Sequence, residues 1–153
     1  MLPSPEDHAW SVRAGASGKD RATIYARNRL VEVGRGISFD DTAERVSALE
    51  LVLGALGADL ATGVLTAAAR RRVEIDRAEA VVTGRLQNAL THLGVVGENG
   101  HPGLEAVSVV LFISTLAPAA DVEAAWKEAL DRSPLYRTFE RLVRLDIRTV
   151  PTP

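Results

Sequence analysis

The residue best suited to chemistry is a single carboxylate, Asp59, in the middle of an apolar stretch. Residues 46 to 72 carry aliphatic side chains at helical spacing, with alanine or glycine at most positions between them. An isolated carboxylate in apolar surroundings is costly unless it finds a partner or gives up its charge. Such carboxylates are frequent in active sites, so Asp59 is the first candidate for proton transfer.

The spacing gives Asp59 a set of neighbours. A helix brings residues at i, i+4, i+7 and i+11 to one face. This face is small and polar, which is typical of a pocket floor rather than of a packing seam. We therefore expect Thr62 to line a pocket together with the carboxylate. The residues on this face are Ala55, Asp59, Thr62 and Thr66.

The composition excludes several classes of function. With 153 residues, 46% hydrophobic residues and a net charge of -2, the chain is typical of one soluble globular domain and indicates neither nucleic acid nor membrane as a partner. It contains no cysteine, which excludes disulfides, thiolate catalysis and cysteine-ligated metal centres. We expect no cofactor. No signal peptide or membrane span is recognised, and we expect a cytoplasmic, bacterial protein.

The pattern predicts an α+β fold in which strands precede and follow a long helix. We expect one domain over residues 1–153, with flexible tails at 1–8 and 150–153. A helix that is apolar on every side is hard to cover with so small a sheet, so a second copy is expected to complete it as a homodimer. The predicted elements are two or three antiparallel strands within 9–14 and 22–33, the helix at 46–72, strands at 73–86 and 104–116, a helix that Asp121 caps and Ser133-Pro134 ends, a turn around 135–140, and a strand at 143–148.

Four segments resemble a known family. SALELVLGALGADLATGV is similar to the central helix of the osmotically inducible protein C and organic hydroperoxide resistance (OsmC/Ohr) family. HPGLEAVSVVLF, ALDRSPLYRTF and RNRLVEVGRGISFDD resemble its central strand, its second signature and its N-terminal hairpin. The resemblance implies an antiparallel sheet with a long buried central helix and a second helix, in an intertwined dimer.

The differences from this family matter most for function. OsmC-like proteins reduce organic hydroperoxides with a peroxidatic thiolate on the central helix and a resolving thiol at the end of the second helix. The matching positions here are Asp59 and Ser133, which cannot carry out thiol chemistry. Glu50 matches the glutamate that orients an N-terminal arginine in the peroxidases. Candidates for that basic residue are Lys19, Arg21 and Arg27.

The resemblance places Asp59, Ser133 and Glu50 around a pocket between subunits, with Tyr136 and one basic residue nearby. Two interpretations remain open. In the first, the chain is a non-redox enzyme for a hydrophobic small molecule, an isomerase, cyclase, lyase or hydrolase, with Asp59 as general acid or base. In the second, it is a non-catalytic binding or structural dimer, related to stress, in which Asp59 bonds to Ser133 or to an arginine.

Other candidate sites are weaker. Glu50 and Asp59 are nine residues apart, on opposite sides of a straight helix and about 13 Å from each other, so a carboxylate dyad is not expected. His92 and His101 lack a third ligand for a metal. Ser133 lacks a neighbouring histidine for a triad. The run Arg70-Arg71-Arg72 is explained by the dipole at the end of the helix.

Overall fold

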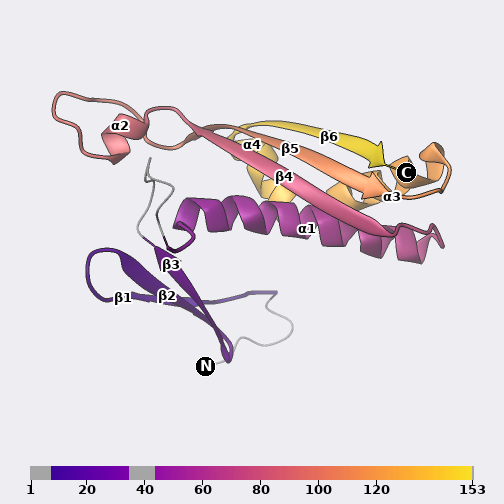
Figure 1. The fold of residues 1–153 in the computed structure, drawn as a ribbon, viewed down its shortest axis with the longest axis horizontal. Helices are drawn as coiled ribbons and strands as arrows, with labels where there is room; N and C mark the ends of the chain where they lie inside the picture. Colours follow the sequence, from indigo (N-terminus) through magenta and orange to yellow (C-terminus); the bar gives the residue numbers. More distant parts are fainter. Residues whose placement is uncertain (1–7, 35–43, 153) are drawn as a thin grey trace. The chain divides into compact units, whose positions relative to one another are not determined.

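The computed structural model describes residues 8–34 and 44–152 (Figure 1). The chain forms two compact units, residues 1–51 and 52–153. Helix α1 (Ala48–Arg70) starts in the first unit and continues into the second. In the sequence, Asp40, Asp41 or Thr42 could cap a turn that leads into this helix, and these residues lie outside the described part. The prediction of one domain over 1–153 stays a prediction.

The first unit contains a three-stranded antiparallel meander, as predicted for this region. Its strands are β1 (Arg13–Ala16), β2 (Arg21–Ala26) and β3 (Arg29–Gly34), in the order β1-β2-β3. Only Val33 and Ser47 are buried among the described residues of this unit. A sheet of this size needs one well-covered apolar face to be stable, and this unit has almost no core of its own.

The second unit contains a sheet in the order β4-β5-β6, in which β4 pairs antiparallel and β6 pairs parallel with β5. The prediction of an antiparallel sheet is therefore wrong for β6. Two helices connect β5 to β6 and carry the chain back across the sheet, as a parallel pair requires. The elements after α1 are β4 (Arg77–Leu86), α2 (Ala89–His92), β5 (Leu104–Ser114), α3 (Ala119–Arg132), α4 (Pro134–Leu142) and β6 (Arg144–Thr152).

Four local predictions need correction. The residues predicted as a turn around 135–140 form α4, because Ser133 caps this helix and Pro134 suits its first position. Asp121 does not cap α3. The cap position is Pro118, and Asp121 lies in the first turn, where the helix dipole favours a carboxylate. Residues 87–102, for which the sequence predicts a loop or hairpin connection, contain the short helix α2. The predicted tail at 150–153 overlaps β6.

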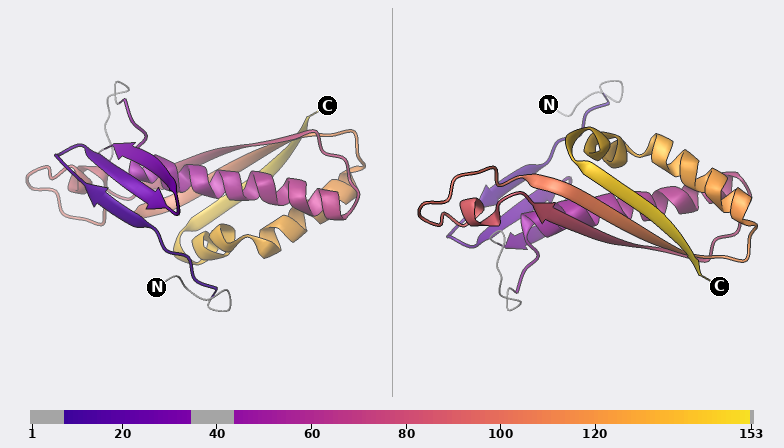
Figure 2. Two further views of the ribbon diagram at one scale, coloured as in Figure 1. Left: turned by 90° about the horizontal axis from the view of Figure 1, so that it is seen from below. Right: turned by 90° about the horizontal axis from the view of Figure 1, so that it is seen from above.

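The core of the second unit lies between the sheet and its helices. Helices α1, α3 and α4 cover one face of the sheet (Figure 2). Helix and sheet approach closely at Gly57, where an added Cβ would lie 2.9 Å from Val82 Cγ2. The largest fully buried side chains are Leu56, Leu60, Val64, Val107, Val109, Leu111 and Ile113.

Helix α1 is buried on one side only in the single chain, and the burial of its other side by a second copy stays a prediction. Away from the sheet, Val52 is 45% and Leu65 is 37% exposed. Within the described residues, α1 is the one helix long and apolar enough to cross a membrane, with a mean hydropathy of 1.7. Core helices share these properties, and the packing of Leu56, Leu60 and Val64 against the sheet assigns α1 to the core.

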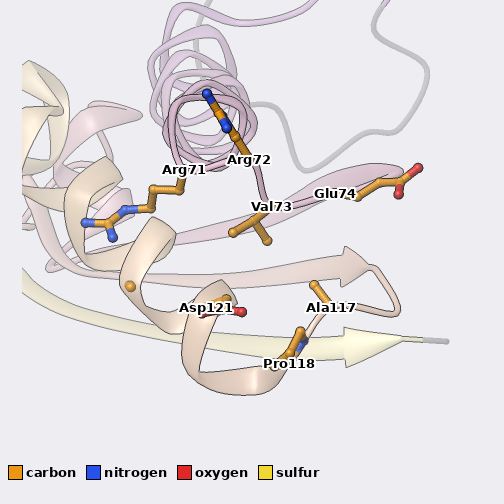
Figure 3. A pocket seen from close by; sticks show the side chains of 8 residues that line it. Arg71, Arg72, Val73, Glu74, Ala117, Pro118 and Asp121 are labelled. Carbon is orange, nitrogen blue, oxygen red and sulfur yellow. The ribbon is translucent and has the colours of Figure 1, made fainter.

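Helix α1 ends in a Schellman motif with an arginine at the left-handed position. The Val73 N–H donates to Ala68 O at 2.9 Å and the Arg72 N–H to Ala69 O at 3.2 Å. Arg72 has a φ of 58°, and its side chain leaves the end of α1 in a different direction from that of Arg71 (Figure 3). Glycine is preferred at this position because a side chain there costs free energy.

Replacing Arg72 by glycine is expected to raise the free energy of unfolding by about 0.5–1 kcal/mol, because the strain of the left-handed conformation is removed. Chemical denaturation of the variant would measure this. Arg71→Gly is the matched control and should destabilise, since Arg71 is not in the left-handed region. A less stable Arg72→Gly chain would contradict the expectation.

Candidate functional site

The structure brings Asp59 and Ser133 into direct contact. The Ser133 hydroxyl donates a hydrogen bond to Asp59 Oδ2 at 2.5 Å. Asp59 lies in the middle of α1, and Ser133 lies between α3 and α4, 74 residues along the chain. Of the two contacts considered for Asp59 in a non-catalytic protein, a serine or an arginine, the structure shows the serine.

Ser133 is held by a second hydrogen bond. Its Oγ accepts from the Tyr136 N–H at 2.9 Å, which caps the N-terminus of α4. Only 5% of Ser133 is exposed. The hydroxyl therefore donates to α1 and accepts from α4, so its orientation is fixed from both sides. A donating hydroxyl in turn fixes the orientation of the carboxylate that accepts from it.

Two threonines lie on the helix face around Asp59. Thr62 Oγ1 donates to Ala58 O at 2.7 Å, and Thr66 Oγ1 donates to Thr62 O at 2.9 Å. Both hydroxyls donate to the helix backbone, and their oxygen atoms can still accept a hydrogen bond. Thr62 is exposed and Asp59 is half-buried. That Thr62 lines a pocket with Asp59 stays a prediction.

Tyr136 lies next to this pair. Burial, and then the nearby Glu140 carboxylate, raise the pKa of the Tyr136 phenol above its ordinary value. The phenol therefore stays protonated at neutral pH, and it can donate but does not act as a base. The Arg137 guanidinium lies 5.6 Å from the centre of the ring.

Glu50 belongs to the start of α1 and forms a capping box with Ser47. The Ser47 N–H donates to Glu50 Oε2 at 2.7 Å, and the Glu50 N–H donates to Ser47 Oγ at 3.1 Å. This reciprocal pair satisfies two backbone donors that the first turn of a helix leaves free. Its contacts give Glu50 a structural function, so a catalytic role for it stays a prediction.

Substituting Glu50 tests this role. The bond from Ser47 N–H lowers the pKa of the Glu50 carboxyl below its ordinary value. The ionised carboxylate therefore stabilises the fold above the ordinary pKa, and this stabilisation is lost as the pH falls through the lowered pKa. Glu50→Ala is expected to lower the free energy of unfolding at pH 7 by about 0.5–1 kcal/mol. Glu50→Gln, which can still cap, should lose less of the free energy of unfolding at pH 7. It should also remove the part of the stability that depends on the ionisation of Glu50. Urea unfolding at pH 7 and pH 4 measures both, and equal losses in the two variants would contradict the capping role.

The three basic candidates stay predictions. Lys19, Arg21 and Arg27 are exposed residues of the first unit, whereas Asp59 and Ser133 belong to the second. Arg27 lies in the turn between β2 and β3 with a φ of 56°.

Metal ligation has no geometric support in the described part of the chain, where no group of three histidines or carboxylates converges. The His101 imidazole accepts from the Gly103 N–H at 3.1 Å.

The contact that the sequence interpretation missed is the capping of α4 by Ser133. The dipeptide Ser133-Pro134, a cap residue before proline, could have indicated a helix start there.

Comparison with known proteins agrees with this architecture. The family model described as OsmC-like protein matches residues 40–148. An OsmC-like protein from Mycoplasma pneumoniae is 14% identical with a TM-score of 0.79, covering 96% of this chain and 99% of that one. An organic hydroperoxide resistance protein from Elizabethkingia anophelis is 12% identical with a TM-score of 0.71, covering 94% and 98%. No curated protein matches the chain.

A third similar structure is an organic hydroperoxide resistance protein OsmC from Legionella pneumophila, 13% identical with a TM-score of 0.68 over 94% of this chain and 98% of that one. At such identities the structural likeness shows the fold alone. The family model, however, spans most of the sequence. The absence of cysteine separates this chain from any thiol-based chemistry. The chain therefore belongs to the OsmC-like protein family.

Proposed function

We propose that this protein has no thiol peroxidase activity and uses Asp59 for proton transfer on a small apolar molecule, with Ser133 as the positioning residue for the carboxylate. The observation that carries the proposal is the hydrogen bond from Ser133 Oγ to Asp59 Oδ2. It joins the two positions that match the redox pair of the family, and it occupies only part of the acceptor capacity of the carboxylate.

The surroundings of the pair favour an apolar ligand. The neighbouring face of α1 carries small side chains, and the hydroxyls of Thr62 and Thr66 donate to the backbone and not to solvent. A carboxylate at the edge of such a face meets an apolar molecule in a poorly solvated setting, where proton transfer is efficient.

We propose that two copies form an intertwined dimer that encloses Asp59 in a pocket between the subunits. Two observations support it: an exposed apolar side of α1, and a first unit with only two buried described residues. Sedimentation of the purified chain should give twice the mass of 16.4 kDa. Leu65→Asp, on the exposed side of α1, should shift the measured mass toward that of the monomer.

Since no step needs an oxidising compartment, we place the protein in the cytoplasm.

A chromogenic base-catalysed elimination tests the proton transfer. In 5-nitrobenzisoxazole a base removes the ring C–H proton, the N–O bond breaks, and a coloured cyanophenolate forms. We expect saturable acceleration over buffer by the natural chain, lost by about 100-fold in Asp59→Asn. The asparagine keeps an oxygen that can accept from Ser133 but cannot take a proton. Ser133→Ala should retain more activity than Asp59→Asn, because the base remains.

The second candidate function is a non-catalytic binding or structural dimer. The observation that favours it is that the Ser133 hydroxyl caps α4 and bonds to α1, which is a structural role. If the natural chain and Asp59→Asn accelerate the elimination equally, the enzymatic proposal is wrong and this second function stands. In either case, the protein should not raise the rate at which cumene hydroperoxide is consumed in the presence of dithiothreitol, compared with the same mixture without protein.

A further inference from the structure

The connection between β4 and β5 contains an asparagine followed directly by a glycine, Asn99-Gly100. Both residues are exposed, and neither belongs to a helix or a strand. Within the part of the chain that the structure describes, the Asn99 side chain and the Gly100 N–H form no hydrogen bond with the protein. The side-chain amide and the backbone nitrogen that follows it are therefore both free to react.

Asn88 holds the loop on either side of this dipeptide. The Asn88 N–H donates to His101 O at 3.1 Å, and Asn88 Nδ2 donates to Glu98 Oε2 at 3.1 Å. The dipeptide lies between these two points of attachment. The loop is therefore closed in the folded protein, while the dipeptide itself stays open to solvent.

The packing of Asn88 explains why residue 100 is a glycine. A Cβ added at Gly100 would lie 3.0 Å from Asn88 Nδ2, which is closer than ordinary van der Waals contact. The Asn88 side chain is fixed, because its Oδ1 also accepts from the Leu90 N–H at 3.0 Å and from the Thr91 N–H at 3.3 Å. The same packing leaves the nitrogen after Asn99 without a side chain of its own residue to shield it.

An asparagine before glycine can close a ring with the backbone. The Gly100 nitrogen attacks Asn99 Cγ, a C–N bond forms, and the bond from Cγ to the side-chain nitrogen breaks, so that ammonia leaves with the proton of the Gly100 N–H. Water then opens the succinimide ring at either carbonyl. Opening at Cγ gives aspartate, and opening at the main-chain carbonyl gives isoaspartate, in which the backbone runs through Cγ. Glycine favours the ring closure because it has no Cβ and leaves the backbone free to adopt the required conformation.

We propose that Asn99 is a site of spontaneous deamidation in the folded protein, with isoaspartate and aspartate as the products. The reaction needs only water, and it exchanges a neutral amide for a carboxylate. The new carboxylate lies next to that of Glu98, which accepts from Asn88 Nδ2. The modification therefore adds a negative charge beside the residue that closes the loop.

The other two asparagines of the chain are internal controls. Asn28 lies in the turn between β2 and β3 and is followed by Arg29, whose side chain obstructs the ring closure. Asn88 is followed by Ala89, and three hydrogen bonds hold its side chain. Both should stay unmodified in the folded chain over the period in which Asn99 reacts.

The test is to age the natural chain at 37 °C and pH 8, with circular dichroism to show that it stays folded. Peptide mapping by mass spectrometry locates the modified residue, and an isoaspartyl methyltransferase with labelled S-adenosylmethionine counts the isoaspartate. We expect Asn99 in the folded chain to react at no less than about a tenth of its rate in urea, because no tertiary contact protects the dipeptide. The Asn99→Gln chain should accept almost no methyl groups, since glutamine would have to close a larger ring.

A rate at Asn99 that is much more than tenfold lower in the folded chain than in urea would overturn the proposal. So would reaction at Asn28 or Asn88 as fast as at Asn99 in the folded chain. Methyl acceptance that persists in the Asn99→Gln chain would also overturn it, because another residue would then be the site.

Discussion

Replacing Asp59 and Ser133 together by cysteine is expected to give a chain that closes a disulfide between α1 and the start of α4. The oxygen atoms of the two natural side chains are 2.5 Å apart, so the side chains already meet. The bond would close a loop of about 75 residues, which corresponds to about 4 kcal/mol of stabilisation over the reduced form in the chain-entropy model. This is among the largest effects expected from changing two residues in this chain.

The disulfide is measured by thiol titration and by melting with and without reductant. Because the natural chain has no cysteine, the two introduced thiols are the only ones counted. The oxidised double variant should show none. Asp59→Cys alone is the control and should show one thiol and no dependence of melting on reductant. Two free thiols after oxidation of the double variant would mean that the side chains do not meet in solution.

Leu60→Ala is expected to lower the free energy of unfolding by about 2–5 kcal/mol. Leu60 is fully buried next to Asp59 and packs with Leu56, Val107 and Val109. Truncation removes its transfer free energy and leaves a cavity that the surrounding sheet fills only in part.

The matched control for Leu60→Ala is Leu65→Ala on the same helix. Leu65 is 37% exposed in the single chain, so its truncation should cost less than 1 kcal/mol in the monomer. In the proposed dimer, the same substitution should also lower the affinity between subunits, seen as a dependence of melting on protein concentration. If the two alanine variants lose equal stability in the monomer, the assignment of Leu60 to the buried side and Leu65 to the exposed side of α1 is wrong.

The sequence predicted the elements that have strong periodicity. The apolar run 104–116 became the central strand β5, and the meander before α1 followed from alternating β-branched residues and turns. The α+β class and the family also followed from the order of these segments. Each of these features depends on local patterns that one chain contains in full.

Other features depend on contacts that local patterns do not contain. The run 46–72 is apolar all round, and only tertiary packing determines that Leu60 faces the sheet and Leu65 does not. The parallel pairing of β6 follows from the path of α3 and α4, not from the sequence of β6. The bond from the Thr62 hydroxyl to Ala58 O is likewise a contact that the spacing of residues does not reveal.

The candidate site was predicted in part. The pairing of Asp59 with Ser133 was one of two contacts proposed for a non-catalytic protein, and it is present. The function of Glu50 as a helix cap was not predicted, although Ser47 and Glu50 have the spacing of a capping box. The resemblance to the peroxidases directed attention to their glutamate rather than to this local signal.

The most direct test of the account is a double-mutant cycle on the Asp59 and Ser133 pair. Asp59→Ala, Ser133→Ala and the double variant are unfolded in urea, and the cap that Ser133 gives to α4 cancels between the two sides of the cycle. If the pair is bonded, the sum of the two single losses in the free energy of unfolding should exceed the loss in the double variant by about 1–2 kcal/mol. This is the size expected for a hydrogen bond to a charged group. Losses that add to within about 0.3 kcal/mol would mean that the two residues do not interact, and the proposed site would be wrong.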